Sequence, residues 1–86
     1  MSMIAVVQRE AERSAARYGD NASTHEALGV LIEEMDELRA AVRSNVLGAV
    51  EKEAIQVAAV ALRLAEHCAL ASKMEYGTAF ALRSLP

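Results

Sequence analysis

The 86-residue sequence predicts an all-α fold, an antiparallel bundle of about four helices in a single domain over residues 1–86. Apolar residues recur at three- and four-residue steps, the period of an amphipathic helix, and no segment has the alternation typical of a strand. Proline, which interrupts helices, occurs only at position 86. Apolar residues make up 53% of the chain but aromatic residues only 3%, so its core consists of small aliphatic side chains. Because such a core is thin, we expect copies of the chain to associate and complete it between them.

The first helix is expected from about Ser2 to Tyr18. Gly19 is suited to ending it, because glycine readily adopts the left-handed conformation that follows many helices. The sequence GDNAS, residues 19–23, is then expected to form a loop.

The second helix is expected from about Thr24 to Ser44, after a capping box formed by Ser23 and Glu26. One apolar stripe along this helix advances by three- and four-residue steps in alternation, which predicts a narrow seam for a partner helix. The members of this stripe are Leu28, Leu31, Met35, Leu38 and Val42.

The third helix is expected from about Val50 to Leu70. It is apolar nearly all round over residues 54–61, which predicts a central position in the bundle. Ser72 and Glu75 form a second possible capping box, which would open a short fourth helix ending near Arg83. Because the links between helices are short, neighbouring helices are expected to run antiparallel.

Composition and charge argue against several classes of protein. The net charge is −3 and there is no Lys/Arg cluster, so a nucleic-acid polymer is not an expected partner. The segment MSMIAVVQRE is too short and too soon charged for a signal peptide, and no uncharged apolar run of 18 residues is present to span a membrane. The single cysteine, Cys68, fits a reducing compartment and is more simply a small apolar residue than a reactive thiol. A cytoplasmic protein is therefore expected.

The second helix carries the acidic sequence EEMDEL over residues 33–38. At about 100° per residue, Glu33 and Asp36 point away from the apolar seam, whereas Glu34 and Glu37 share one partly covered flank. Their three-residue spacing makes the two carboxylates neighbours. Like charges on a flank that packs are unfavourable unless a cation lies between them. A solvated acidic face without a ligand is the alternative.

Two further oxygen-bearing side chains, Glu53 and Gln56, have the same spacing near the start of the third helix. If the second and third helices are antiparallel, Glu37 and Glu53 can face each other. Two carboxylates from one helix cannot complete the octahedral shell of Mg²⁺, so oxygens from a second helix are needed. This arrangement predicts a metal site formed by Glu34, Glu37, Glu53 and Gln56. The alternatives are a favourable position in the helix dipole for Glu53 and a core hydrogen bond for Gln56.

These acidic residues follow a pattern of E-E-x-x-E, about fifteen further residues and then E-x-x-D. Only the final Asp of the pattern is absent, because Gln56 occupies that position. The pattern is present here as EEMDE, residues 33–37, and EAIQ, residues 53–56. The pattern resembles that of the MazG-like nucleoside triphosphate pyrophosphohydrolases, all-α proteins related to the dimeric dUTPases. The wider segments HEALGVLIEEMDELRAAVRS and EAIQVAAVALRLAE are also similar to short family members of the phage and mobile-element type. The resemblance covers about residues 23–67.

This resemblance implies house-cleaning hydrolysis of a (deoxy)nucleoside triphosphate to the monophosphate and pyrophosphate, with Mg²⁺ or Mn²⁺ as cofactor. Four glutamates would be catalytic: Glu34, Glu37 and Glu53 would bind the metal, and Glu33 would orient or activate the attacking water. Gln56 stands where the family usually has Asp; its amide can bind the ion without adding charge, or can orient a neighbouring glutamate. A homodimer or homotetramer is also implied. The alternative function is a non-catalytic helical module that binds a nucleotide or a protein partner.

Two basic residues are candidates for binding the substrate phosphates. Lys52 lies near the turn between the second and third helices, and Arg63 lies on the same stripe of the third helix as Gln56. The alternatives are solvated surface for Lys52 and a structural salt bridge for Arg63.

Overall fold

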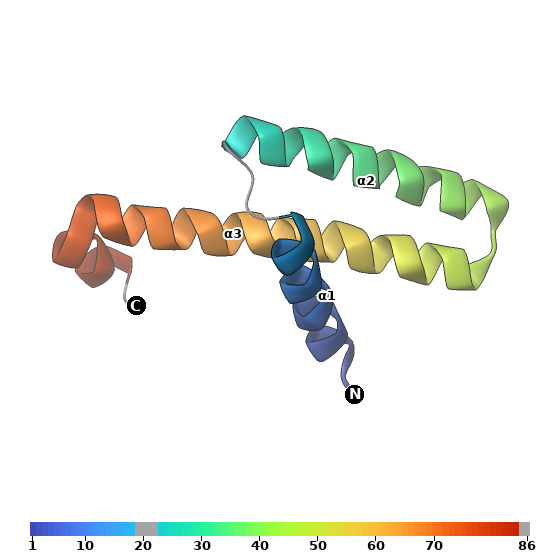
Figure 1. Cartoon of the computed structure of the whole chain (residues 1–86), viewed down its shortest axis with the longest axis horizontal. Helices are drawn as coiled ribbons and strands as arrows, with labels where there is room; N and C mark the ends of the chain where they lie inside the picture. Colours follow the sequence, from blue (N-terminus) through green and yellow to red (C-terminus); the bar gives the residue numbers. More distant parts are fainter. Residues whose placement is uncertain (19–22, 85–86) are drawn as a thin grey trace.

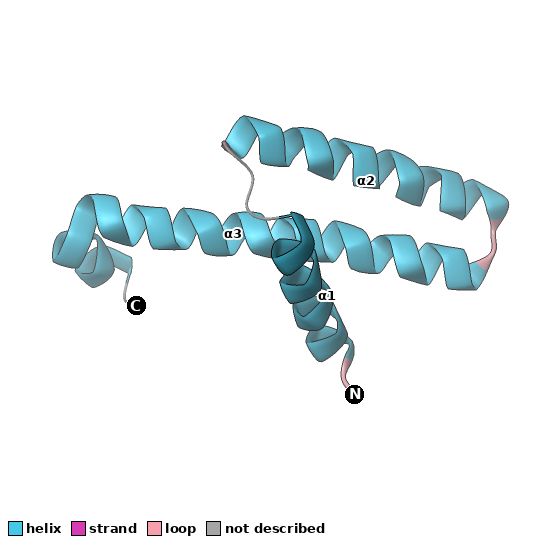
Figure 2. Cartoon of the chain, in the orientation of Figure 1, coloured by secondary structure: helices cyan, strands magenta, loops and turns pink. Residues whose placement is uncertain are grey.

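The computed structural model describes the backbone of residues 1–18 and 23–84, and the side chains of residues 1–16 and 23–73. Within these residues the chain is all-α: α1 spans Met3–Tyr18, α2 spans Thr24–Ser44 and α3 spans Leu47–Ser84 (Figures 1 and 2). The all-α prediction is confirmed, and the first two helices have the expected bounds to within one residue. Most of the loop expected over residues 19–23 lies outside the described residues.

α2 and α3 form an antiparallel hairpin (Figure 1). At the start of α2, the Ser23 Oγ accepts a hydrogen bond from the Glu26 backbone N–H at 3.1 Å, which satisfies one free donor of the first turn. At its end, Asn45 adopts the left-handed conformation with φ 56° and ψ 29°, and its N–H donates to the Ala41 and Val42 carbonyls. This cap ends α2 and lets the chain reverse before α3 begins at Leu47.

α1 lies across α3 instead of along it, and in the described residues it contacts α3 but not α2 (Figure 1). Hydrogen bonds between described residues join the crossing helices. Gln56 Nε2 donates to Glu10 Oε1 at 2.8 Å, and Arg63 Nη1 donates to Ser14 Oγ at 3.1 Å. The expected antiparallel arrangement therefore holds for α2 and α3, and was wrong for α1.

α3 continues through the position where a fourth helix was expected to begin. A capping role for Ser72 requires non-helical backbone at that residue, but α3 is helical from Leu47 to Ser84. The side chain of Glu75, the other half of the expected capping box, lies outside the described residues. The prediction of a separate fourth helix was wrong, because no proline or glycine between residues 70 and 76 ends α3 and each added residue extends the existing hydrogen-bond ladder.

The most buried side chains are small. Among the described residues, the buried apolar positions are all alanines: Ala11, Ala27, Ala41 and Ala59. Alanine allows two helices to approach closely but buries little apolar area. No large side chain in the described part of the chain is fully buried, so a single copy has very little core.

The face of α2 that turns toward α3 is centred on small side chains beside the apolar seam. The buried Ala27 and Ala41 mark this inward face, with the half-buried Glu34 midway between them. Of the seam, Leu28, Met35 and Val42 are exposed, whereas Leu31 and Leu38 are half-buried. The small side chains pack on α3 because they allow the two helix axes to come closer than leucine or methionine would.

One segment of α3, Leu47–Lys73, is long and apolar enough to cross a membrane by length and composition, with a mean hydropathy of 1.4. The sequence prediction that no segment could span a membrane was based on the absence of a long uncharged run. Mean hydropathy does not support that prediction, because this segment contains few charged residues. Core helices of soluble proteins pass the same test, although only 6% of this segment is buried within the chain. α1 and α2 both pack against α3.

Candidate metal site between α2 and α3

Three glutamates meet between α2 and α3. Glu34 and Glu37 lie one turn apart on α2, and Glu53 lies near the start of α3. One carboxylate oxygen from each residue lies within 4.8 Å of the other two. The hairpin causes this convergence because the end of α2 runs beside the start of α3. These are the glutamates expected from their spacing to come together; that they bind a metal stays a prediction.

Two of the three carboxylates are partly withdrawn from water. Glu34 Oε2 and Glu53 Oε2 are both buried and have no hydrogen-bond partner, whereas the Glu37 side chain is exposed. Burial raises the pKa of Glu34, and the negative charges of Glu37 and Glu53 raise it further. A buried carboxylate oxygen without a partner is costly, and either a proton or a cation relieves that cost.

The carboxylate oxygens lie close enough together for one divalent cation to contact all three after side-chain adjustment. They lie within 4.8 Å of one another, and carboxylate oxygens are the ligands that Mg²⁺ and Ca²⁺ take in proteins. One oxygen from each of the three glutamates would fill three of the six positions around Mg²⁺, which leaves the others for water or a ligand.

Exposed Glu33 lies beside this cluster on α2 but is not among the three residues whose oxygens converge. Its charge makes a smaller contribution than those of Glu37 and Glu53 to the raised pKa of Glu34. Glu33 is therefore near enough to influence the site while it remains in contact with solvent.

Gln56, the fourth expected ligand, is engaged on the other side of α3. Its amide nitrogen donates to Glu10 of α1 at 2.8 Å. Gln56 follows Glu53 by three residues, so the two side chains diverge by about 60° around the helix, one toward α2 and the other toward α1. The core hydrogen-bond alternative describes Gln56 in this structure, although its partner is a side-chain carboxylate.

Glu10 is held as an ion by its neighbours. The Arg13 guanidinium hydrogen-bonds both of its carboxylate oxygens, and Gln56 adds a third donor. These contacts, Arg13 first, lower the pKa of Glu10 to about 2 against the opposing effect of burial. The role of Glu10 was not predicted from the sequence, because its partner lies 46 residues away. The only local signal was the Glu10–Arg13 pair at i, i+3.

Lys52 lines a cavity of about 450 Å³ between α1 and the start of α3, and none of the three clustered glutamates lines it. The cavity has mixed charge, and Arg9 and Arg13 also contribute to it. Its lining residues are Val6, Arg9, Glu10, Arg13, Gly48, Glu51, Lys52, Ile55 and Gln56. The contribution of Lys52 to phosphate binding stays a prediction.

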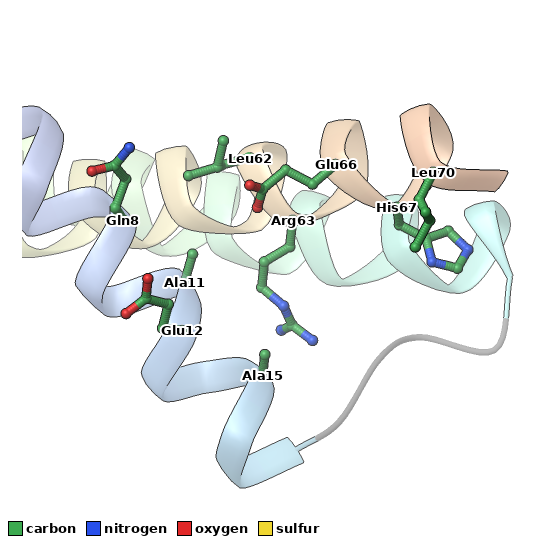
Figure 3. Close-up of a pocket in the computed structure, with 9 residues that line it drawn as sticks. All are labelled: Gln8, Ala11, Glu12, Ala15, Leu62, Arg63, Glu66, His67 and Leu70. Atoms are coloured by element: carbon green, nitrogen blue, oxygen red, sulfur yellow. The ribbon is translucent and has the colours of Figure 1, made fainter. Parts of the chain in front are cut away.

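Arg63 lies farther along α3, in a second cavity of about 340 Å³ at the crossing with α1 (Figure 3). Its guanidinium extends from α3 toward α1 and donates to Ser14, beside Glu12, Glu66 and His67. Ten residues of helix separate Arg63 from Glu53, which corresponds to about 15 Å along the axis. The structure therefore does not bring Arg63 to the glutamate cluster, and its contact with Ser14 supports a structural role.

Comparison of the chain with protein-family models, curated proteins and solved structures found no match.

Proposed function

We propose that the protein is a Mg²⁺-dependent nucleoside triphosphate pyrophosphohydrolase of MazG-like type. The observation that carries this proposal is the convergence of Glu34, Glu37 and Glu53 from two helices, with two buried oxygens that have no protein partner. The type of reaction is proposed from the resemblance of the acidic pattern, residues 33–37 and 53–56, to that of the MazG-like family. The products would be a (deoxy)nucleoside monophosphate and pyrophosphate, formed from free nucleotides in the cytoplasm.

The three clustered glutamates would hold Mg²⁺, or Mn²⁺ in its place. When bound, such an ion neutralises phosphate charge and lowers the pKa of a water ligand. Glu33, exposed and next to Glu34, would orient the attacking water or accept its proton. Glu37 turns toward the α1 side of the hairpin, the side on which Lys52 and Arg9 line their cavity. The triphosphate would therefore approach from the α1 side.

Turnover is tested by pyrophosphate release from a panel of common and damaged nucleoside triphosphates with Mg²⁺. Glu37→Ala should abolish release and weaken Mn²⁺ binding in calorimetry while the helical circular dichroism stays unchanged, because Glu37 is exposed. Asp36→Asn is the matched control, since Asp36 is an exposed neighbour outside the cluster and should leave both properties intact. Wild-type protein that is folded but releases no pyrophosphate from any nucleotide would refute the proposed reaction.

The contact between Gln56 and Glu10 favours a second candidate function. The Gln56 amide is hydrogen-bonded to Glu10 of α1, so the cluster has three carboxylates. The resembled pattern has an acidic residue at this position, which would add a fourth. A non-catalytic module would retain metal or nucleotide binding, or bind a protein partner, without hydrolysis. Nucleotide binding in calorimetry together with no pyrophosphate release would support this second function over the first.

A further inference from the structure

The Gln56 side chain lies between the glutamate cluster and the crossing helix α1. Around α3, Gln56 is about 60° from Glu53, which faces α2, and about 100° in the opposite direction from Ile55, which lines the cavity against α1. Side chains three residues apart on a helix are neighbours, so a change of rotamer can carry the Gln56 amide toward Glu53. The amide therefore has two positions within reach, and the structure shows the one directed at α1.

Glu10 of α1 holds the amide in this position. Gln56 Nε2 donates to Glu10 Oε1 at 2.8 Å, and the Arg13 guanidinium hydrogen-bonds both oxygens of the same carboxylate. These contacts, Arg13 first, lower the pKa of Glu10 to about 2, so the carboxylate is ionised at neutral pH. Hydrogen bonds to an ionised partner are stronger than those between neutral groups. Glu10 therefore competes effectively with the glutamate cluster for this amide.

Two carboxylates of the glutamate cluster lack the partner that the amide would supply. Glu34 Oε2 and Glu53 Oε2 are buried and accept no hydrogen bond in the described part of the chain, although Gln56 is one turn from Glu53. One oxygen from each of three glutamates leaves positions open around a divalent cation, and an amide carbonyl is among the oxygen ligands that such ions take. An amide turned toward Glu53 would therefore add a neutral ligand to the site.

The packing of α1 permits this exchange. Among the described residues, α1 contacts α3 but not α2, and Ala11 is the only residue of α1 that is buried. Glu10 and Gln56 both line the cavity of about 450 Å³ between α1 and α3, so the bond between them borders open space. Breaking this bond should leave intact the α2–α3 hairpin, which positions the three glutamates.

We propose that α1 regulates the metal site: Glu10 holds the Gln56 amide away from the glutamate cluster, and loss of the Glu10–Gln56 bond lets the amide join the cluster and tighten the binding of a divalent cation. α1 would thereby change the affinity of a site to which it contributes no ligand. This inference rests on the part of the proposed function that assigns a cation to the cluster, and it does not depend on the reaction. By linkage, a bound cation must weaken the contact of α1 with α3 by the same factor.

Calorimetric titration of the full chain with Mn²⁺ alone measures the effect. Glu10→Ala should tighten Mn²⁺ binding by at least about fivefold, the lower end of the usual range for coupled sites. Loss of a negative charge by itself weakens the binding of a cation, so the direction of the change identifies the mechanism. Glu12→Ala is the matched control, because exposed Glu12 carries the same charge on α1 but lines the other cavity, around Arg63 (Figure 3). It should not tighten binding by more than about twofold.

Gln56→Ala tests whether the amide is responsible for the gain. The double variant Glu10→Ala, Gln56→Ala should bind Mn²⁺ no more tightly than Gln56→Ala alone, because the released amide is then missing. Hydrogen exchange covers the case in which Glu10→Ala fails to fold. In the wild type, Mg²⁺ should speed the exchange of the backbone amides of α1, because the coupling acts equally in both directions.

Mn²⁺ binding that Glu10→Ala leaves unchanged or weakens would overturn the regulation by α1 and leave the proposed metal site in place. Equal tightening by Glu10→Ala and Glu12→Ala would overturn it too, as would a gain that persists in the double variant or α1 exchange that Mg²⁺ slows or leaves unchanged. If neither the wild type nor any variant binds Mn²⁺, this inference fails together with the proposed function.

Discussion

The Glu34 carboxylate has one buried oxygen without a hydrogen-bond partner and two other carboxylates nearby. Its raised pKa means that, between the ordinary value of 4.5 and the folded-state value, the folded protein binds more protons than the unfolded chain. Stability must then fall as the pH rises through this window. A cation in the cluster would remove the cause of the effect, because it stabilises the ionised form.

The free energy of unfolding of the metal-free protein should therefore be higher at pH 5 than at pH 7.5. Mn²⁺ or Mg²⁺ should increase it more at pH 7.5, by about 2.7 kcal/mol when the free ion is at 100 times its dissociation constant. Urea denaturation with the metal or with EDTA measures both effects. Glu34→Gln should reduce the pH dependence and the metal effect together. If the metal stabilised wild type and Glu34→Gln equally, the cation would be binding elsewhere.

Gln56 has a clear structural reason to be an amide. Its N–H donates to the ionised Glu10, whose pKa is about 2. An acid at position 56 would place a second carboxylate against Glu10 and remove a donor. The stabilisation that ionised Glu10 gives is present above pH 4.5 and is lost as the pH falls toward 2. It therefore does not change between pH 5 and pH 7.5, the range in which the effect of Glu34 is measured.

Gln56→Glu should destabilise the fold by about 1.5–3 kcal/mol, the usual range for a lost hydrogen bond to a charged group. Adding Glu10→Gln should recover part of that loss, because the amide and the carboxylate then exchange places. A double-mutant cycle in urea at pH 7 gives the coupling energy between the two positions. Strictly additive losses would contradict a direct Gln56–Glu10 bond.

Among the elements, the α2–α3 hairpin depends on how α2 ends. Asn45 is the only non-glycine residue with positive φ in the described residues, and its N–H caps two carbonyls of α2. Asparagine tolerates the left-handed conformation better than most residues, and glycine adopts it without a steric penalty. The register of Glu37 against Glu53 follows from this turn, so the cap supports the candidate site as well as the fold.

Asn45→Ala should lower the free energy of unfolding by about 1 kcal/mol, because alanine is strained in the left-handed conformation. Asn45→Gly should leave it unchanged or slightly higher. Thermal denaturation of both variants against wild type measures the difference. Equal stability of the alanine and glycine variants would show that the left-handed cap is absent in solution.

At the scale of the whole molecule, the chain is extended for its length. Its radius of gyration is 15.2 Å, whereas a compact chain of 86 residues should have about 12 Å. The described residues bury only alanines fully, so a single copy has little apolar burial to offset the entropy of folding. Stability should then depend on contacts between copies.

The thermal midpoint of the wild type should rise with protein concentration, because dissociation precedes or accompanies unfolding. Scans over a hundredfold concentration range measure this shift. A wild-type midpoint that is independent of concentration would contradict folding coupled to association.

The sequence by itself determined the features that depend on neighbours within one or two turns. These are the all-α class, the bounds of α1 and α2, the Ser23 cap and the three-residue spacing of Glu34 and Glu37. They are predictable because backbone hydrogen bonds, caps and helical periodicity act over about four residues. The sequence also allowed the prediction that Glu37 and Glu53 face each other, since a short turn leaves two helices few alternatives to antiparallel packing.

Only the tertiary structure decided how the helices are placed around α3. The crossing of α1, the bond between Gln56 and Glu10 and the inward face of α2 depend on which side chains allow two helix axes to approach closely. Alanines lie at the helix contacts in place of larger apolar residues, because they let the helix axes come closer. The periodicity within one helix does not show which side chains will form these contacts. As a result, Leu28, Met35 and Val42 of the apolar seam remain exposed in the described structure, whereas Leu31 and Leu38 are half-buried.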